Sequence, residues 1–137
     1  MSLLQTIRKA LKSKSKSSIS LKYKVDDDER LLFAAINEGN FQIARSLVEG
    51  KVSVNCKDSS GCTPMIAVCR LLTTKNITNK TADIVKFVTF LIEQNAFLHE
   101  RDIFGRSALD YSCENDGNDD IRQLFHGAIQ QSLHRYL

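Results

Sequence analysis

The features that this sequence lacks exclude several classes of protein. No apolar stretch approaches the roughly 20 residues that cross a bilayer, and the apolar core of a signal peptide does not follow the basic N-terminus. We therefore expect an intracellular protein, cytoplasmic or nuclear, whose four cysteines are reduced thiols. The 137 residues include no tryptophan, 42% are hydrophobic and 26% are charged. This composition is typical of one domain with a modest core.

The sequence also lacks the patterns of catalytic and metal sites. The four cysteines have no C-x-x-C spacing, and no H-x-x-x-H pair accompanies them. The three histidines are scattered, with no nucleophile and orienting acid beside them. Neither a glycine-rich phosphate loop nor a paired-carboxylate site is present. We expect neither an enzyme nor a bound cofactor or metal.

Charge is distributed unevenly along the chain. Residues 1–25 carry seven basic side chains and no acid, whereas the remaining 112 residues carry 12 basic and 16 acidic side chains, a net charge of −4. We interpret residues 1–25 as a basic segment and linker attached to a mildly acidic body, with a separate role. Residues 26–29 lack both the alternating ligands and the glycine of a calcium loop, so this acidic run is typical of a first helical turn.

Two stretches of the body repeat one pattern. Residues 39–61 and 81–105 each contain an apolar run of helical period, a polar break and then Asp-x-x-Gly. The sequences GCTPMIAVC and GRSALDYSC begin at the two glycines and share Thr or Ser, Met or Leu, and Cys at equal offsets. Such self-similarity indicates a repeat architecture.

The pattern resembles the ankyrin-repeat family, whose unit of about 33 residues joins a β-turn to two antiparallel helices. DSSGCTPMIAVC (58–69) matches the family's D-x-x-G-x-T-P-L, with Met65 in the Leu place, and departs from the motif at Ile66, Val68 and Cys69. The resemblance covers residues 26–126. It implies an all-α solenoid of stacked helix-turn-helix units with short β-turn hairpin tips.

The resemblance divides the body into about three repeats, 26–57, 58–101 and 102–126, followed by a C-terminal helical extension over 127–137. The two Asp-x-x-Gly glycines lie 44 residues apart. We assign the excess of 11 residues to an insertion over 71–81, between the two helices of the second repeat. The first and last repeats are more polar, as solenoid end caps are.

Local signals predict how the helices begin and end. Thr63 is expected to cap a helix that begins at Pro64, after a turn in which Gly61 has a positive φ. After the second helices, the resemblance puts Asn95 in the place of the family's left-handed glycine, and in the preceding repeat the usual glycine is displaced to Gly50.

The same resemblance predicts a core and a place for each cysteine. Cys69 and Cys113 are expected to be small buried spacers, and Cys62, on a turn, to be the most exposed thiol and a candidate for redox regulation. The expected core comprises Leu32, Ala35, Ile43, Leu47, Met65, Val68, Val85, Val88, Leu91, Leu109, Ser112, Ile121 and Leu124.

The family's mode of action implies a surface that binds another protein or peptide, formed by hairpin tips and the exposed face of the first helices. The corresponding tip residues are Lys57, Ser59, Ser60, Cys62, Arg101, Ile103, Phe104 and Arg106. The corresponding first-helix residues are Asn37, Glu38, Arg70, Leu71, Glu114 and Asn115. The apolar pair Ile103-Phe104 resembles an interface hot spot. The alternative is that Phe104 folds down onto a neighbouring hairpin or the insertion.

The N-terminal segment offers a second candidate site. Apolar residues recur on one helical face of residues 3–11, so the segment is a candidate for binding an anionic membrane surface or calmodulin. The candidate contacts are Leu4, Ile7, Arg8, Lys9, Leu11 and Lys12. The alternatives are a disordered solubilising tail and a helix that packs on the first repeat. Nucleic acid is not expected, because aromatic residues do not interleave with the basic ones.

Overall fold

The computed structural model of the chain describes residues 26–74, 81–114 and 119–135, except for the side chains of 132–135. Over these residues the chain is helical and no strand is formed, which confirms the all-α class. The elements are α2 (Asp27–Asn37), α3 (Phe41–Glu49), α4 (Pro64–Arg70), the 3-10 helix η1 (Leu71–Thr73), α5 (Thr81–Glu93), α6 (Ala108–Ser112) and α7 (Asp119–Arg135).

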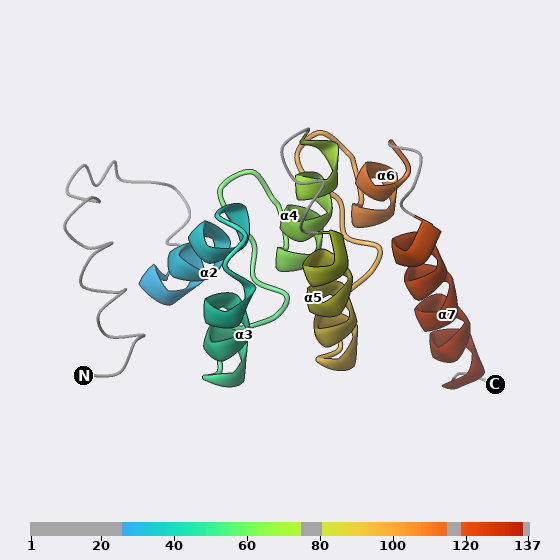
Figure 1. Ribbon diagram of the computed structural model, residues 1–137, viewed down its shortest axis with the longest axis horizontal. Helices are drawn as coiled ribbons and strands as arrows, with labels where there is room; N and C mark the ends of the chain where they lie inside the picture. The colour runs from blue at the N-terminus through green and yellow to red at the C-terminus, as the bar shows by residue number, and fades with distance from the viewer. Residues whose placement is uncertain (1–25, 75–80, 115–118, 136–137) are drawn as a thin grey trace.

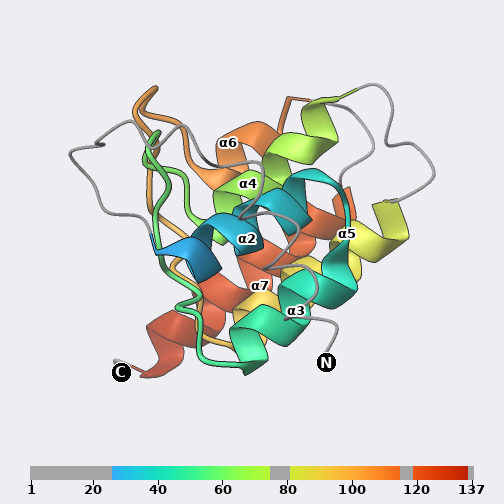
Figure 2. The same cartoon turned by 90° about the vertical axis from the view of Figure 1, so that its left-hand side faces the viewer.

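The helices form two layers. Figure 1 shows α2, α4 and α6 in one row and α3, α5 and α7 in a second row beneath it. Each antiparallel pair stacks beside the next, so α4 packs against α2 on one side and α6 on the other. The loops from α3 to α4 and from α5 to α6 run side by side along one edge (Figure 2). This is the predicted solenoid with its hairpin tips on one edge.

The first helices begin where the sequence indicates. The Oγ1 atom of Thr63 accepts a hydrogen bond of 3.3 Å from the N–H of Ile66, and Pro64 occupies the first turn of α4. At α6, Ser107 and Asp110 form a reciprocal capping box. Caps of this kind satisfy N–H groups that a helix cannot pair internally, so both starts are well defined.

The left-handed residues after α3 and α5 occupy equivalent positions, Lys51 and Asn95. Asn95 has the expected left-handed conformation, with φ of 64°, while Gly50 has φ of −83° and Lys51 is left-handed, with φ of 82°. The cause is a Schellman motif, in which the N–H of Val52 bonds the carbonyl of Leu47 at 3.1 Å. This ring places the left-handed residue one position after the C-cap, Gly50.

Part of the expected insertion over 71–81 is helical. Residues 71–73 continue the first helix of the second repeat as η1, with Leu71 and Leu72 buried, and α5 begins at Thr81. Residues 75–80 lie outside the described part. In the last repeat, α7 continues through Gly127 as far as Arg135, so the expected extension is part of that helix as far as it is described. The domain boundaries themselves stay predictions.

Most of the predicted core is buried. Four of the predicted residues are only partly buried, namely Ile43, Val85, Leu109 and Leu124. Cys69 is buried as expected, but Cys113 is exposed. Cys69 lies in α4, which α6 covers, whereas Cys113 caps the end of α6 and no described helix packs beyond it. The prediction of a buried Cys113 was therefore wrong.

Replacement of two glycines by alanine should change the free energy of unfolding in opposite directions. At both, an added Cβ meets nothing within 4 Å, so only backbone effects act. Gly105 has φ of 75°, where alanine is strained, and Gly105→Ala should lower the free energy of unfolding by about 1 kcal/mol. Gly127 lies within α7, and Gly127→Ala should raise that free energy by about 0.5–1 kcal/mol. Urea denaturation of both variants checks this, and shifts of the same sign would contradict it.

Candidate partner-binding surface

Two hairpin tips are built by equivalent aspartates. The Oδ1 atom of Asp58 accepts hydrogen bonds from the N–H groups of Ser60 (2.8 Å) and Cys62 (3.0 Å). In the next repeat, the Oδ1 atom of Asp102 accepts equivalent bonds from Phe104 and from the residue two places on, both at 3.0 Å. A glycine of positive φ completes each turn. The repeated Asp-x-x-Gly therefore encodes one turn geometry, in which the aspartate satisfies the backbone of the tip.

The second tip is also fixed to its helix. Tyr111 of α6 donates a hydrogen bond from its hydroxyl to the Oδ2 atom of Asp102, and both side chains are buried. Burial raises the pKa of Tyr111 to about 12, and the hydrogen bond and charge of Asp102 act in the same direction. Burial also opposes ionisation of Asp102, but the bonds from Tyr111 and two backbone N–H groups outweigh it and lower the pKa of this carboxyl. The position equivalent to Tyr111 in the second repeat is Ala67, so this link is specific to the second tip.

Contacts between the repeats hold the two tips side by side. The N–H of Ile103 donates to the carbonyl of Ser60 at 3.0 Å. The ammonium group of Lys57 lies 2.8 Å from the carboxylate of Glu100. Figure 2 shows the two loops adjacent along their length. The two tips therefore lie side by side along one edge of the array.

A large apolar pair projects from this surface. The exposed fractions are 68% for Ile103 and 72% for Phe104, so Phe104 does not fold down onto the neighbouring hairpin. Arg101 donates to the carbonyl of Gly105 at 2.8 Å, which holds this cation beside the tip. Phe97 is also 58% exposed, in the loop before the tip, and the sequence reading missed it because its position follows no family motif.

On the other side of the tip, Arg106 is held in place by α6. Its guanidinium lies 4.8 Å from the ring centroid of Tyr111 and forms an ion pair with Glu114. The structure thereby brings together two of the predicted contacts, Arg106 and Glu114. Asn37, Glu38 and Arg70 are exposed at the ends of first helices, as expected.

Two predicted surface residues are buried instead. Cys62 is 1% exposed, and its Sγ atom accepts a hydrogen bond of 3.1 Å from Arg70. Its side chain turns inward because the Asp58 turn directs it under the tip rather than away from it. Leu71 is buried because η1 continues the packed helix. The expected exposure of both residues was wrong, and the redox role proposed for Cys62 loses its basis.

Several expectations fall outside the described residues or find no site within them. Asn115 and all the candidate contacts of residues 1–25 are not described. In the part of the chain that is described, no group of three potential metal ligands comes together. No described helix is both long enough and apolar enough to cross a bilayer.

The comparison with protein families agrees with this architecture. The family model for ankyrin repeats matches residues 31–132 as three copies. The chain belongs to the ankyrin-repeat family. Ankyrin repeats are generally protein–protein interaction modules, and the family is typically non-catalytic. The two tips and the exposed ends of the first helices therefore form part of the exposed surface of an ankyrin array.

Removal of the Tyr111 hydroxyl should destabilise the array in a pH-dependent way. Near neutral pH, Tyr111→Phe should lower the free energy of unfolding by about 1.5–3 kcal/mol, because a charge-assisted bond to Asp102 is lost. Since the pKa of Tyr111 is raised to about 12, this contribution is complete below about pH 10 and declines as the pH rises through about 12. It also declines at acid pH, as Asp102 becomes protonated near its lowered pKa. Denaturation of both proteins across pH measures the difference, and a pH-independent difference would contradict the assignment.

Thiol labelling should distinguish the four cysteines. Only Cys113 is exposed, while burial raises the pKa of Cys56 to about 12 and that of Cys69 still further. We expect one fast-reacting thiol in the native protein, with the others reacting only upon unfolding. The change Cys113→Ser should remove the fast phase and Cys62→Ser should leave it unchanged. The reverse result would show that Cys62 is accessible in solution.

Proposed function

We propose that this ankyrin array is a non-catalytic adaptor or scaffold that binds a partner protein through its hairpin tips, with Ile103 and Phe104 as the central anchor. The observation that carries the proposal is the exposure of these two large apolar side chains on one tip. Exposed apolar clusters rimmed by polar groups are typical of interaction sites, and large side chains dominate interface energetics.

The rigidity of the tip supports the same function. Asp102 accepts hydrogen bonds from the backbone N–H groups of Phe104 and Arg106, and Tyr111 holds the aspartate from α6. The backbone of Ile103 is bonded to the first tip. A loop fixed before binding loses little conformational entropy on association, so more of the burial of Phe104 contributes to affinity.

The charges beside the anchor indicate the chemistry of the partner. Arg101 lies 3.6 Å from Asp110, but both side chains are largely exposed. Exposed ion pairs of this kind are worth at most about 1 kcal/mol, so Arg101 remains available to a partner carboxylate. We expect a partner with an apolar pocket beside acidic or carbonyl acceptors. The first-helix ends, including Arg70 and Glu38, would form the rim.

The alternative function assigns recognition to the basic N-terminus. In that case residues 1–16 target the array to an anionic membrane surface or to calmodulin, and the tips are secondary. The charge of residues 1–25 supports this alternative, since seven basic side chains are not balanced by any acid.

Affinity capture with variants of the whole chain tests the two functions. Replacement of both tip residues, Ile103→Ala with Phe104→Ala, should weaken partner capture at least about tenfold. Phe97→Ala is the matched control, because it removes another exposed phenylalanine away from the tip, and it should change capture less than about threefold. Unchanged denaturation midpoints would show that both variants remain folded. If the tip variant still captures partners and removal of residues 1–16 abolishes capture, the tip proposal fails.

A further inference from the structure

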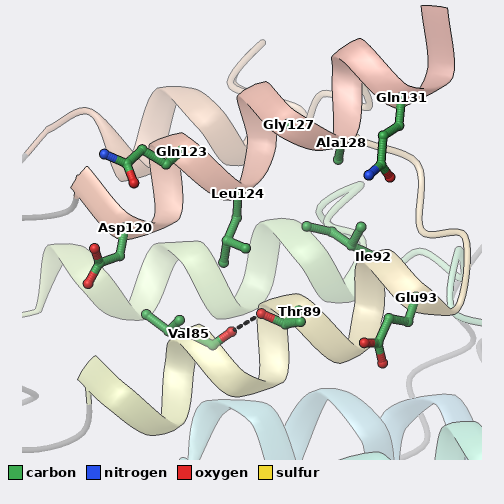
Figure 3. Close-up of a pocket in the computed structure, with 10 residues that line it drawn as sticks. All are labelled: Val85, Thr89, Ile92, Glu93, Asp120, Gln123, Leu124, Gly127, Ala128 and Gln131. Carbon is green, nitrogen blue, oxygen red and sulfur yellow. Dashed lines mark hydrogen bonds between the residues drawn. The ribbon is translucent and has the colours of Figure 1, made fainter. Parts of the chain in front are cut away.

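A groove lies between the second helices α5 and α7. It has a volume of about 570 Å³, and Figure 3 shows Val85, Thr89 and Ile92 of α5 opposite Leu124 and Ala128 of α7. The groove explains why Val85 and Leu124, both predicted for the core, are only partly buried. We call this hollow the α5–α7 groove.

A hollow of about 450 Å³ also lies between the preceding second helices, α3 and α5, but aromatic side chains line it. Between α3 and α5 the rings of Phe41 and Phe87 stack with their centroids 5.0 Å apart, and Arg45 covers the ring of Phe90 at 4.6 Å. No aromatic residue lines the α5–α7 groove, whose apolar lining residues are small or aliphatic. Its apolar surface is therefore left without aromatic cover among the described residues.

Gly127 adds to the depth of the groove. It lies inside α7, where glycine costs about 1 kcal/mol relative to alanine. No positive φ requires it, and an added Cβ would meet nothing within 4 Å. Packing within the described array thus gives no reason for a glycine here. Absence of a side chain lets another segment approach the backbone of α7 closely.

The charges that line the groove have one sign. Glu93 and Asp120 are its charged lining residues, both are exposed, and they lie toward opposite ends of it in Figure 3. Neither forms an ion pair with a described residue. An apolar floor between two unpaired carboxylates favours an amphipathic segment that carries positive charge.

The chain contains such a segment in its own N-terminus. Residues 3–12 have Leu3, Leu4, Ile7 and Leu11 at helical spacing, and three basic side chains flank that face. Residues 13–25 then connect the segment to α2 and can extend over at most about 43 Å. We propose that residues 3–12 bind in the α5–α7 groove of the same chain, with the apolar face on Val85, Ile92 and Leu124 and the basic side chains toward Glu93 and Asp120.

Docking in the groove would decide when the segment is accessible. One apolar face cannot cover α7 and contact a membrane or calmodulin at the same time. Because short tethers raise the effective concentration to about the millimolar range, even a weak contact is largely formed within one chain. The Coulombic part of this contact should weaken as salt is added.

Hydrogen–deuterium exchange of the whole chain at low salt tests the proposal. We expect amides of residues 3–12 to exchange at least about tenfold more slowly than in an unstructured peptide. The double charge reversal Glu93→Lys with Asp120→Lys should remove most of this protection. The matched control, Glu49→Lys with Asp119→Lys, makes the same change in net charge at exposed positions outside the groove and should retain it.

A steric variant tests the groove without a change in charge. Gly127→Leu improves helix propensity and places a side chain in the groove, so the array should stay folded while the segment is displaced. Gln130→Leu, on the same helix but outside the groove lining, is its control and should retain protection.

The proposal is overturned if residues 3–12 are unprotected in the wild-type chain. It is equally overturned if protection is the same in the groove variants and in their controls, as it would be for packing on the first repeat. Protection that disappears on about hundredfold dilution, together with a dimeric mass, would assign the groove to the segment of a second copy and also exclude the intrachain contact.

Discussion

Helix α4 can bury all but its last residue only because a helix lies on each side of it, and this requirement for two neighbours governs the rest of the array. Every residue from Pro64 to Cys69 is buried, with α2 on one side and α6 on the other. The equivalent residues of the last repeat show how the loss of one neighbour reduces burial. Leu109, equivalent to Met65, is only partly buried, and Cys113, equivalent to Cys69, is exposed. A repeat of this kind is stable through its neighbours rather than alone.

The proposed recognition surface depends on a different kind of interaction. Stacking places the tips next to one another, but the carboxylates of Asp58 and Asp102 give each tip its shape. Only the second tip is also bonded to its helix, through Tyr111, and that same tip carries the exposed apolar pair. Rigid support and apolar exposure thus coincide at one position, which is how a loop presents large side chains without collapsing onto its own scaffold.

The sequence predicted those features that depend on neighbours in the chain. Asp-x-x-Gly and Thr-Pro act over a few residues, so the turns and the start of α4 were predicted correctly. Exposure of Cys62 and Cys113 was not, because it depends on what lies above each side chain in the array. Nothing in the pattern indicated the Tyr111 bond, because the equivalent residue in the repeat is an alanine.

The two proposed surfaces lie in different layers of the array. The tips extend from the first helices, while the α5–α7 groove is formed by second helices, in the other row of Figure 1. Coupling between two sites requires an element whose equilibrium both ligands bias. The chain segment that joins them runs from Glu93 through the Asn95 cap to Asp102, and hydrogen bonds to the preceding repeat fix it at Phe97 and Ile103. A segment fixed at several points transmits little displacement, so the tip and the groove are expected to bind their ligands independently. A single small array can then hold a partner on one layer and control its own N-terminus on the other.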